Sequence, residues 1–291
     1  MHNLKENALG SQRELSTCLT ILVDDNVSAG SNLVQEHGFA VLVERGPQRI
    51  LFDTGQGRAL ENNAATLQKD LSDLNFVILS HGHYDHTGGL LHAVKMNPGI
   101  RIVSHPALFS SHMKLEVGKM ASHSVGIPCA MRELEELGAS FQFTAEFRQV
   151  CQGVWFTGYV PRVFKTPPAG ALITENSEGM VPDSMEDDAS LVIETSSGFC
   201  VLLGCAHAGL RNILEHVRVH LGIDHVHAVI GGTHLGPADR EDTLEAIRAL
   251  EEFKVQLVAP THCTGSWPSE VLRSYFGTRY CEATAGTEFV F

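Results

Sequence analysis

Residues 79–89 read LSHGHYDHTGG, and this short stretch carries the strongest structural and chemical signal in the chain. An apolar run at residues 76–79 leads into it and predicts a buried strand. Four side chains that can bind a metal then follow within six positions: His81, His83, Asp85 and His86. Three neutral imidazoles and one carboxylate can hold one or two divalent ions and leave a position open for water. The stretch therefore predicts a hydrolytic metal centre at the end of a strand.

Length and charge restrict the class of protein and its partners. The 291 residues and 43% hydrophobic content are ordinary for one large globular α/β domain, or for two intimately joined ones. The formal net charge of −13 argues against nucleic acid as a partner, because phosphate-backbone binding depends on Lys and Arg clusters. A small-molecule substrate that is anionic or phosphorylated remains compatible, since bound metals supply local positive charge. No apolar run approaches the roughly 20 residues that a membrane helix needs, so we expect no membrane partner.

Three features describe how the chain is organised. Residues 1–17 are polar and lack the apolar core of a signal peptide, so we interpret them as a leader. The seven cysteines are odd in number and scattered, which indicates reduced thiols, and both features favour the cytoplasm. Residues 18–291 are expected to form a single domain. It would carry a lid-like insertion at about 157–188, where Pro, Gly and acidic residues predict a long loop.

Apolar runs and turn residues divide this domain into two halves of similar kind. Strands are predicted at 19–23, 39–43, 49–52, 76–79, 100–103, 191–194, 199–203, 226–230 and 255–259. Helices are predicted at about 59–69, 87–97, 131–138, 210–221 and 240–253. Each half begins with strands and continues with strand–loop–helix units whose strands end in polar groups. The pattern is typical of the α/β class.

The string HGHYDHTGG resembles the H-x-H-x-D-H signature of the metallo-β-lactamase-fold superfamily. LFDTG at residues 51–55 is similar to the second marker of that fold, an Asp at the end of an early strand. LVDDN, TGYVPR, GCAHAG, GGTHL and PTHCTG together resemble one subgroup, that of the dihydropterin-methyl-(ribofuranosyl)aminobenzene phosphate synthases of methanopterin biosynthesis. The resemblance runs from about residue 18 to 265. It implies an αββα sandwich of two mixed β-sheets flanked by helices.

The same resemblance implies a set of metal ligands. His81 and His83 would bind a first metal, and His207, which follows a buried-looking strand, is the candidate for its remaining ligand. Asp85 and His86 would bind a second metal together with His262, which follows a late strand. Asp85 is also the candidate catalytic residue, because a carboxylate there could orient or deprotonate a water. Zinc is the expected ion, with iron or manganese as alternatives.

One part of the sequence departs from the family pattern. Most superfamily members carry Gly-Asp at the end of the strand that precedes His207, and that Asp bridges the two metals. This chain carries Gly204-Cys205 there, and Asp187-Asp188 lies near where a Gly-His turn is usual. Three alternatives stay open: a thiolate ligand from Cys205, a carboxylate ligand from Asp188, or a second metal that is weakly held.

Three further residues are candidates for supporting roles. Asp53 could accept a hydrogen bond from a metal-bound imidazole and so orient it, or could simply cap the turn that follows. His234 follows two glycines at a strand end, which suggests a substrate contact or an additional ligand, although a polar residue there is common in any fold. Asn26 could line the rim of the site or lie in a solvated turn. We interpret His105, His112, His123, His216, His220, His225 and His227 as ordinary histidines.

The leading functional hypothesis is a metal-dependent hydrolase that uses a metal-activated water. The subgroup resemblance implies an alternative, a transferase that joins a pterin methyl diphosphate to an aromatic amine. Trp155, Phe156, Tyr159 and Phe164 could stack on a pterin, or could belong to the core. A non-catalytic metal-bound sensor is the third possibility. The chain contains no G-x-S-x-G elbow, no phosphate-binding G-x-x-x-x-G-K-[ST] loop and no dinucleotide-binding G-x-G-x-x-G turn.

Overall fold

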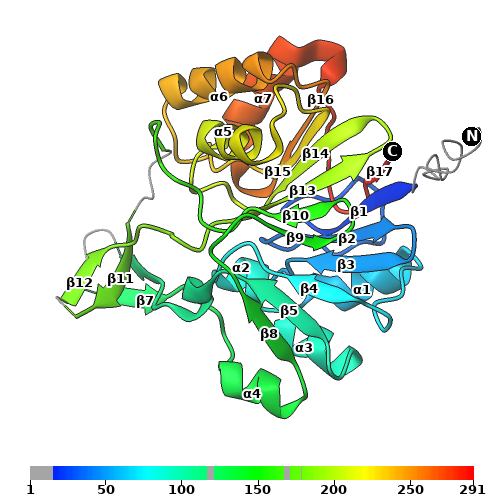
Figure 1. Cartoon of the computed structure of the whole chain (residues 1–291), viewed down its shortest axis with the longest axis vertical. Helices are drawn as coiled ribbons and strands as arrows, with labels where there is room; N and C mark the ends of the chain where they lie inside the picture. The colour runs from blue at the N-terminus through cyan, green and yellow to red at the C-terminus, as the bar shows by residue number, and fades with distance from the viewer. Residues whose placement is uncertain (1–15, 117–120, 167–170, 178) are drawn as a thin grey trace, which may run out of the picture.

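Two β-sheets pack face to face, and helices cover the outer face of each sheet (Figure 1). This order of layers is the αββα sandwich that the sequence predicts. The computed structural model describes residues 16–116, 121–166, 171–177 and 179–291. Residues 1–15 of the predicted leader lie outside the described residues, whereas Thr17 already belongs to the first strand.

The first sheet has seven strands in the order β17-β1-β2-β3-β4-β5-β8. Their bounds are β1 Thr17–Val23, β2 Ala40–Arg45, β3 Gln48–Phe52, β4 Phe76–Ile78, β5 Arg101–Ser104, β8 Ser140–Phe143 and β17 Glu288–Val290. β1, β2 and β3 are antiparallel, and Gly46 takes a φ of +54° in the turn between β2 and β3. β3, β4, β5 and β8 are parallel. β17 pairs with β1, so the end of the chain lies beside its first strand (Figure 1).

The second sheet has six strands in the order β16-β15-β14-β13-β10-β9. Their bounds are β9 Arg148–Cys151, β10 Val154–Phe156, β13 Ser190–Thr195, β14 Gly198–Leu203, β15 Ala228–Gly232 and β16 Leu257–Thr261. β9, β10, β13 and β14 pair antiparallel, whereas β14, β15 and β16 are parallel. The carboxyl ends of these three parallel strands therefore lie at one edge of the sheet.

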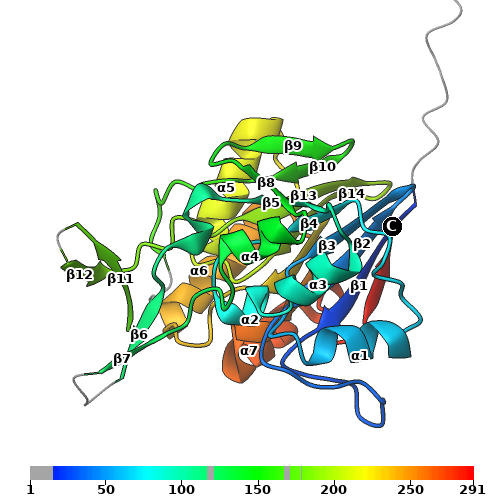
Figure 2. The same cartoon turned by 90° about the horizontal axis from the view of Figure 1, so that it is seen from below.

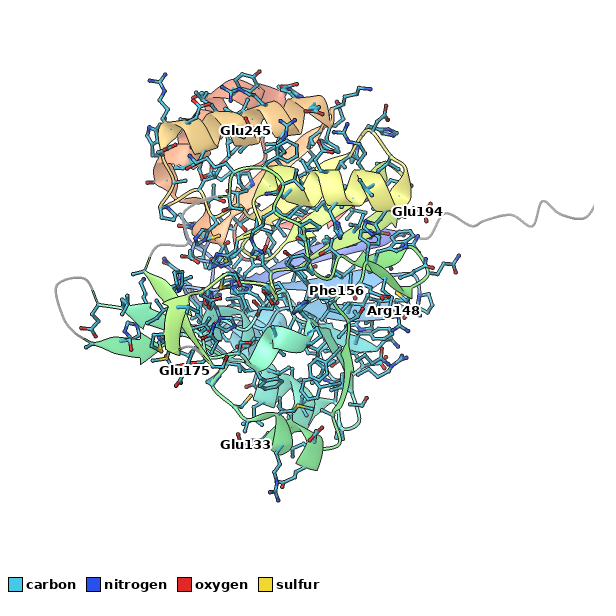
Figure 3. All side chains as sticks on the ribbon, turned by 60° about the vertical axis from the view of Figure 1, so that its left-hand side comes forward. Glu133, Arg148, Phe156, Glu175, Glu194 and Glu245 are labelled. Atoms are coloured by element: carbon cyan, nitrogen blue, oxygen red, sulfur yellow. The ribbon has the colours of Figure 1, made fainter. Side chains whose placement is uncertain are left out.

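Alternate side chains of a strand enter different cores, as the period of two requires. In β14, Cys200 and Leu202 pack between the two sheets, while Val201 and Leu203 pack under the helices. Phe156 also belongs to the core between the sheets, and Figure 3 shows it between the two layers. This aromatic ring is therefore a core residue and offers no stacking surface to a pterin.

Helices complete the sandwich on both sides (Figure 1). The first sheet is covered by α1 Ala59–Thr66, α3 Leu90–Met96 and α4 Met131–Glu136, and the second by α5 Leu210–Leu221, α6 Arg240–Glu252 and α7 Ser266–Phe276. The short helix α2, Tyr84–Thr87, contains part of the histidine cluster, and 3-10 turns occur at Pro106–Phe109, His262–Thr264 and Gly277–Arg279. α5 ends at Gly222 with a φ of +66°, as expected for a glycine stop. Within the described ranges, no helix is long and apolar enough to cross a membrane.

A small four-stranded sheet projects from the sandwich, and we call it the arm (Figure 2). It consists of β6 Met113–Leu115, β7 Ser122–Ser124, β11 Leu172–Asn176 and β12 Gly179–Pro182, in the order β12-β11-β6-β7. Two of these strands come from the segment 157–188, which the sequence analysis treats as a long loop. That expectation is wrong for 172–176 and 179–182, because β11 pairs with β12 and with β6, which lies more than 50 residues earlier in the chain. Such pairing has no local signal.

Candidate metal centre

The candidate ligands follow the carboxyl ends of neighbouring strands. Asp53 follows β3, His81 follows β4, Cys205 and His207 follow β14, His234 follows β15, and His262 follows β16. Parallel strands present their carboxyl ends at a common edge, where polar side chains can converge. The fold thereby brings together side chains that are far apart in sequence, such as His86 and His262.

A first group of donors contains His81, His83 and His207, whose ligand atoms all lie within 4.8 Å of one another. His81 Nε2 lies 3.1 Å from His83 Nδ1. Both ring nitrogens of His207 are buried and have no hydrogen-bond partner in the described part of the chain. Burial, reinforced by neighbouring imidazoles, holds the pKa of His81 and of His207 well below its usual value, and burial lowers the pKa of His83 to about 4. Neutral imidazoles with free nitrogens fit a divalent metal ion.

A second group contains Asp85, His86 and His262. His86 Nδ1 lies 2.7 Å from Asp53 and His262 Nδ1 lies 2.6 Å from Asp25, so each Nδ1 donates its proton to a carboxylate. In the neutral imidazoles the two Nε2 atoms then carry lone pairs, and they face each other at 3.2 Å. Asp85 Oδ2 lies 3.7 Å from His86 Nε2 and 3.5 Å from His262 Nε2. Only a cation between these atoms makes the arrangement favourable, so the donor set fits a metal ion.

Without a metal, a proton can occupy this space. Burial alone lowers the pKa of His262, but the neighbouring Cys263 thiolate and the carboxylates of Asp25 and Asp85 outweigh it and raise that pKa well above its usual value. A divalent ion would therefore compete with a proton for the second group.

Asp53 connects the two groups. Its Oδ1 accepts from the backbone N–H of Ser80 at 2.7 Å, and its Oδ2 accepts from the Ser80 hydroxyl and from His86 Nδ1, each at 2.7 Å. The Ser80 oxygen in turn accepts from His81 Nδ1 at 2.9 Å. One buried carboxylate thus sets the orientation of an imidazole in each group. Asp53 adopts a φ of +58°, a left-handed conformation that Asp tolerates better than most residues.

The rim of the site contains residues that sequence reasoning only partly identified. Asp25 accepts from both His262 and His37, the latter at 2.8 Å, and Asp24 accepts from the His262 backbone N–H at 3.0 Å. Asn26 is exposed, and its backbone N–H donates to Asp24 at 2.9 Å, so the structure places it in a capped turn beside the site. His37 is 53% exposed, with Nε2 3.4 Å from Asp85 Oδ2. His37 was missed because it follows a loop without any metal-binding pattern.

His234 lies beside the first group. Its ring centroid is 4.1 Å from that of His207, and its Nδ1 is buried without a hydrogen-bond partner among the described residues. Its φ of +52° is unusual for a non-glycine residue. The structure therefore brings His234 to the site edge, as the two preceding glycines suggested.

The comparisons with known proteins agree with this geometry. The family model described as the metallo-β-lactamase superfamily matches residues 34–262. The chain belongs to this superfamily. A solved structure described as a metal-dependent hydrolase of the β-lactamase superfamily has 28% sequence identity and a TM-score of 0.81, and the match covers 94% of this chain and 98% of that one. The predicted family and fold are thus confirmed.

Two curated relatives within the superfamily come from Methanocaldococcus jannaschii. One is the 7,8-dihydropterin-6-methyl-4-(β-D-ribofuranosyl)-aminobenzene-5′-phosphate synthase, which is 31% identical over 84% of this chain and 86% of its own length. The other, an uncharacterized protein, is 28% identical over 85% of this chain and 90% of its own length. The subgroup resemblance therefore extends over most of the chain.

Cys205 and Asp188, the two residues considered in place of the usual bridging Asp, have different surroundings in the structure. Cys205 Sγ lies 3.2 Å from His86 Nε2, and it forms a compact donor group with His81 and His86. Asp188 is buried, and its Oδ2 accepts from the Ala208 backbone N–H at 2.8 Å. Asp188 thus holds the turn that carries His207 and keeps a buried Oδ1 without a hydrogen-bond partner among the described residues, and Cys205 stands among the donor atoms of His81 and His86.

A buried triad joins the arm to the histidine cluster. His112, which precedes β6, lies 2.6 Å from Asp183 and 3.4 Å from Asp187, both of which follow β12. Asp187 also accepts from the Gly82 backbone N–H at 2.7 Å, between His81 and His83. Sequence reasoning took His112 for an ordinary histidine, because its carboxylate partners lie about 70 residues away and no spacing reveals them.

This triad predicts a pH dependence of folding stability in the metal-free protein. Burial alone lowers the pKa of His112, but the hydrogen bond to Asp183 and the nearby carboxylate of Asp187 outweigh it and raise the pKa to about 10 from its usual 6.5. A raised pKa contributes stability that is complete below pH 6.5 and is lost as the pH rises through 10. The His112→Gln variant should therefore be less stable than the wild type by about 1.5–3 kcal/mol near neutral pH. The difference should shrink in alkaline solution.

Urea unfolding of chelator-treated protein between neutral and alkaline pH measures this difference. His123→Gln is the matched control, because His123 lies on the same arm, faces Glu116 at 3.7 Å and is 54% exposed. A stability difference for His112→Gln that stays constant with pH would contradict the charged triad.

Proposed function

We propose that this chain is a metal-dependent hydrolase for a small anionic substrate, with zinc as its expected ion and iron or manganese as alternatives. One observation carries the proposal: His86 Nε2 and His262 Nε2 face each other at 3.2 Å beside the Asp85 carboxylate, while Asp53 and Asp25 accept from the two Nδ1 atoms. The first group, His81, His83 and His207, would hold a second ion in the same way. A cytoplasmic location belongs to this proposal, and the seven cysteines are free thiols in the structure.

When bound, a divalent ion acidifies a water molecule and polarises a substrate oxygen. Although burial alone raises the pKa of Asp85, the neighbouring His86 and His262 lower it well below its usual range, so the carboxylate is ionised and can orient an attacking water by accepting a hydrogen bond from that water's proton. His37 stands between Asp85 and solvent, with Nε2 3.4 Å from Oδ2. Its exposed imidazole can carry that proton to the bulk water. Asp53 keeps His81 and His86 oriented throughout.

A transferase that joins a pterin methyl diphosphate to an aromatic amine is the second candidate. It is favoured by the relative named as a 7,8-dihydropterin-6-methyl-4-(β-D-ribofuranosyl)-aminobenzene-5′-phosphate synthase, at 31% identity over 84% of this chain. Of the aromatic residues considered for pterin stacking, Phe156 is buried in the core and Trp155 packs against Phe199. Tyr159 and Phe164 are 39% and 37% exposed and remain available.

The two reactions differ in their need for an amine. The full-length protein, loaded in turn with zinc, iron and manganese, would be given a dihydropterin methyl diphosphate with and without an arylamine, and diphosphate release would be measured. Parallel assays would use esters, thioesters, lactones and phosphodiesters. We expect the metal-loaded protein to turn over substrate when no arylamine is present. Diphosphate release that requires the arylamine would overturn the hydrolase in favour of the transferase, and metal binding without turnover of any substrate would favour a sensor.

A further inference from the structure

Two cysteines and a histidine follow the ends of three adjacent strands. Cys205, His234 and Cys263 each lie two residues beyond the end of their strand, on β14, β15 and β16 respectively. These strands are parallel neighbours, with Leu203 opposite Gly231 and Gly232 opposite Thr261. Continued past the strand ends, this register places His234 level with Cys263 and Cys205 one residue away from that level, at the same edge of the sheet. Two sulfurs and an imidazole therefore converge at the edge of the second sheet.

The contacts between these residues are close. The ligand atoms of Cys205, His234 and Cys263 all lie within 4.8 Å of one another. The His234 backbone N–H donates to Cys263 Sγ at 3.2 Å, and the Cys263 thiol faces the Cys205 carbonyl oxygen at 3.6 Å. The buried Nδ1 of His234 has no hydrogen-bond partner in the regions that the structure describes. A buried ring nitrogen of this kind is costly unless it finds a partner.

The backbone is unusual at each of the three donors. His234 itself has a φ of +52°, Ala206 after Cys205 has a φ of +57°, and His262 before Cys263 has a φ of +48°. Non-glycine residues rarely adopt this left-handed conformation and persist in it where the surrounding structure enforces it, often at functional sites. Here they turn each strand end toward the same point.

Glycine supplies the space for the sulfurs. A Cβ on Gly232 would lie 2.7 Å from Cys263 Sγ and 3.3 Å from the Cys205 Cα. The same Cβ would clash with the Gly204 carbonyl oxygen, so the backbone here has no room for a larger residue. Cys205 is buried, whereas His234 and Cys263 are partly exposed, so a small ion can reach the group from solvent.

We propose that Cys205, His234 and Cys263 form a sulfur-rich metal position that takes a thiophilic ion such as Zn²⁺, Cd²⁺ or Cu⁺. It adjoins the two groups of the candidate metal centre and shares Cys205 with them, since Cys205 Sγ also lies 3.2 Å from His86 Nε2. The other groups offer mainly nitrogen and oxygen, so this position is the one that selects soft ions. The inference does not depend on the proposed function, because binding of the ion requires no substrate.

Cadmium is the probe, because it binds sulfur and gives thiolate-to-metal absorption in the ultraviolet. Metal-stripped, full-length protein would be loaded with Cd²⁺ and desalted, and cadmium per chain and the absorption would be measured. Cys263→Ser and His234→Gln remove donors that are absent from the other groups. Cys281→Ser is the matched control, since Cys281 is a partly exposed thiol that contacts Glu282.

The wild type and Cys281→Ser should bind one cadmium ion more per chain than Cys263→Ser or His234→Gln. The thiolate absorption should fall in Cys263→Ser. Circular dichroism shows whether each variant is folded. If Cys263→Ser does not fold, the cadmium content of His234→Gln tests the proposal. Equal cadmium content and absorption in the wild type, Cys263→Ser and His234→Gln would overturn the proposal. Loss of the absorption in Cys205→Ser alone would also overturn it, because the sulfur would then serve only the His81–His86 group.

Discussion

Replacing Asp85 by Asn should lower turnover by about 10²–10⁴-fold, the range found when a proton-accepting group is removed. The amide has the same shape as the carboxylate but carries no charge and accepts a proton poorly. It also removes the anion that lies within 3.7 Å of the His37, His86 and His262 nitrogens. Metal content should fall at the same time, because the second group loses its carboxylate donor. Steady-state kinetics and elemental analysis of the same preparation measure both effects.

Asp73→Asn is the matched control for charge, because Asp73 is exposed and precedes β4 on the same sheet. It should behave as the wild type in both assays. The backbone carbonyl of Asp85 accepts from the Phe39 N–H at 3.2 Å and is retained in the variant, so folding should be preserved. An Asp85→Asn protein with normal turnover and normal metal content would rule out Asp85 as ligand and as base.

Replacing Asp53 by Ala should lower the free energy of unfolding by about 3–5 kcal/mol, as for the removal of one partner from a buried charged network. It should also weaken metal binding by about 10–100-fold. The Ser80 N–H and hydroxyl and His86 Nδ1 would all lose their acceptor at once. Urea unfolding and competition with a chromophoric chelator measure the two effects.

Two further variants separate the effect of the lost Asp53 charge from the effect of placing alanine in a left-handed conformation. Asp53→Asn retains the size and the tolerance for a φ of +58° but lacks the charge, so it should keep the metal-binding defect and lose less stability. Gln68→Ala places alanine at an exposed position with a φ of +57°, which isolates the cost of the left-handed backbone. If Asp53→Ala is no less stable than Gln68→Ala, the carboxylate does not hold the two imidazole groups together.

Individual strands and helices were predicted from local sequence patterns, and the structure contains them. The apolar run before the histidine cluster forms β4, and the helix predicted over 210–221 forms α5 with its glycine stop. The arm was not predictable in this way. β6 and β7 contain serine, lysine and exposed histidine rather than apolar alternation, so their pairing depends on partners from the distant segment 172–182.

The candidate site likewise contains some residues that the sequence predicted and others that it did not. The family resemblance implied His81, His83, Asp85, His86 and His262, and its position at a strand end suggested His207. His37 and His112 were not identified, because each is a single residue without a neighbouring donor of recognisable spacing, and Cys263 was not singled out although it follows His262 directly. Their partners, Asp85, Asp183 and Cys205, come from other strands and loops.

The sequence by itself determined the family, the layered α/β fold and the strand end that carries the histidine cluster, because periodicity and a compact motif are local properties. Only the tertiary structure decided which donors meet. Cys205 Sγ lies 3.2 Å from His86 Nε2, although the two residues are 119 positions apart in the sequence. The reason is physical: side chains converge where parallel strands end at a common edge, and that edge exists only after the sheets have formed.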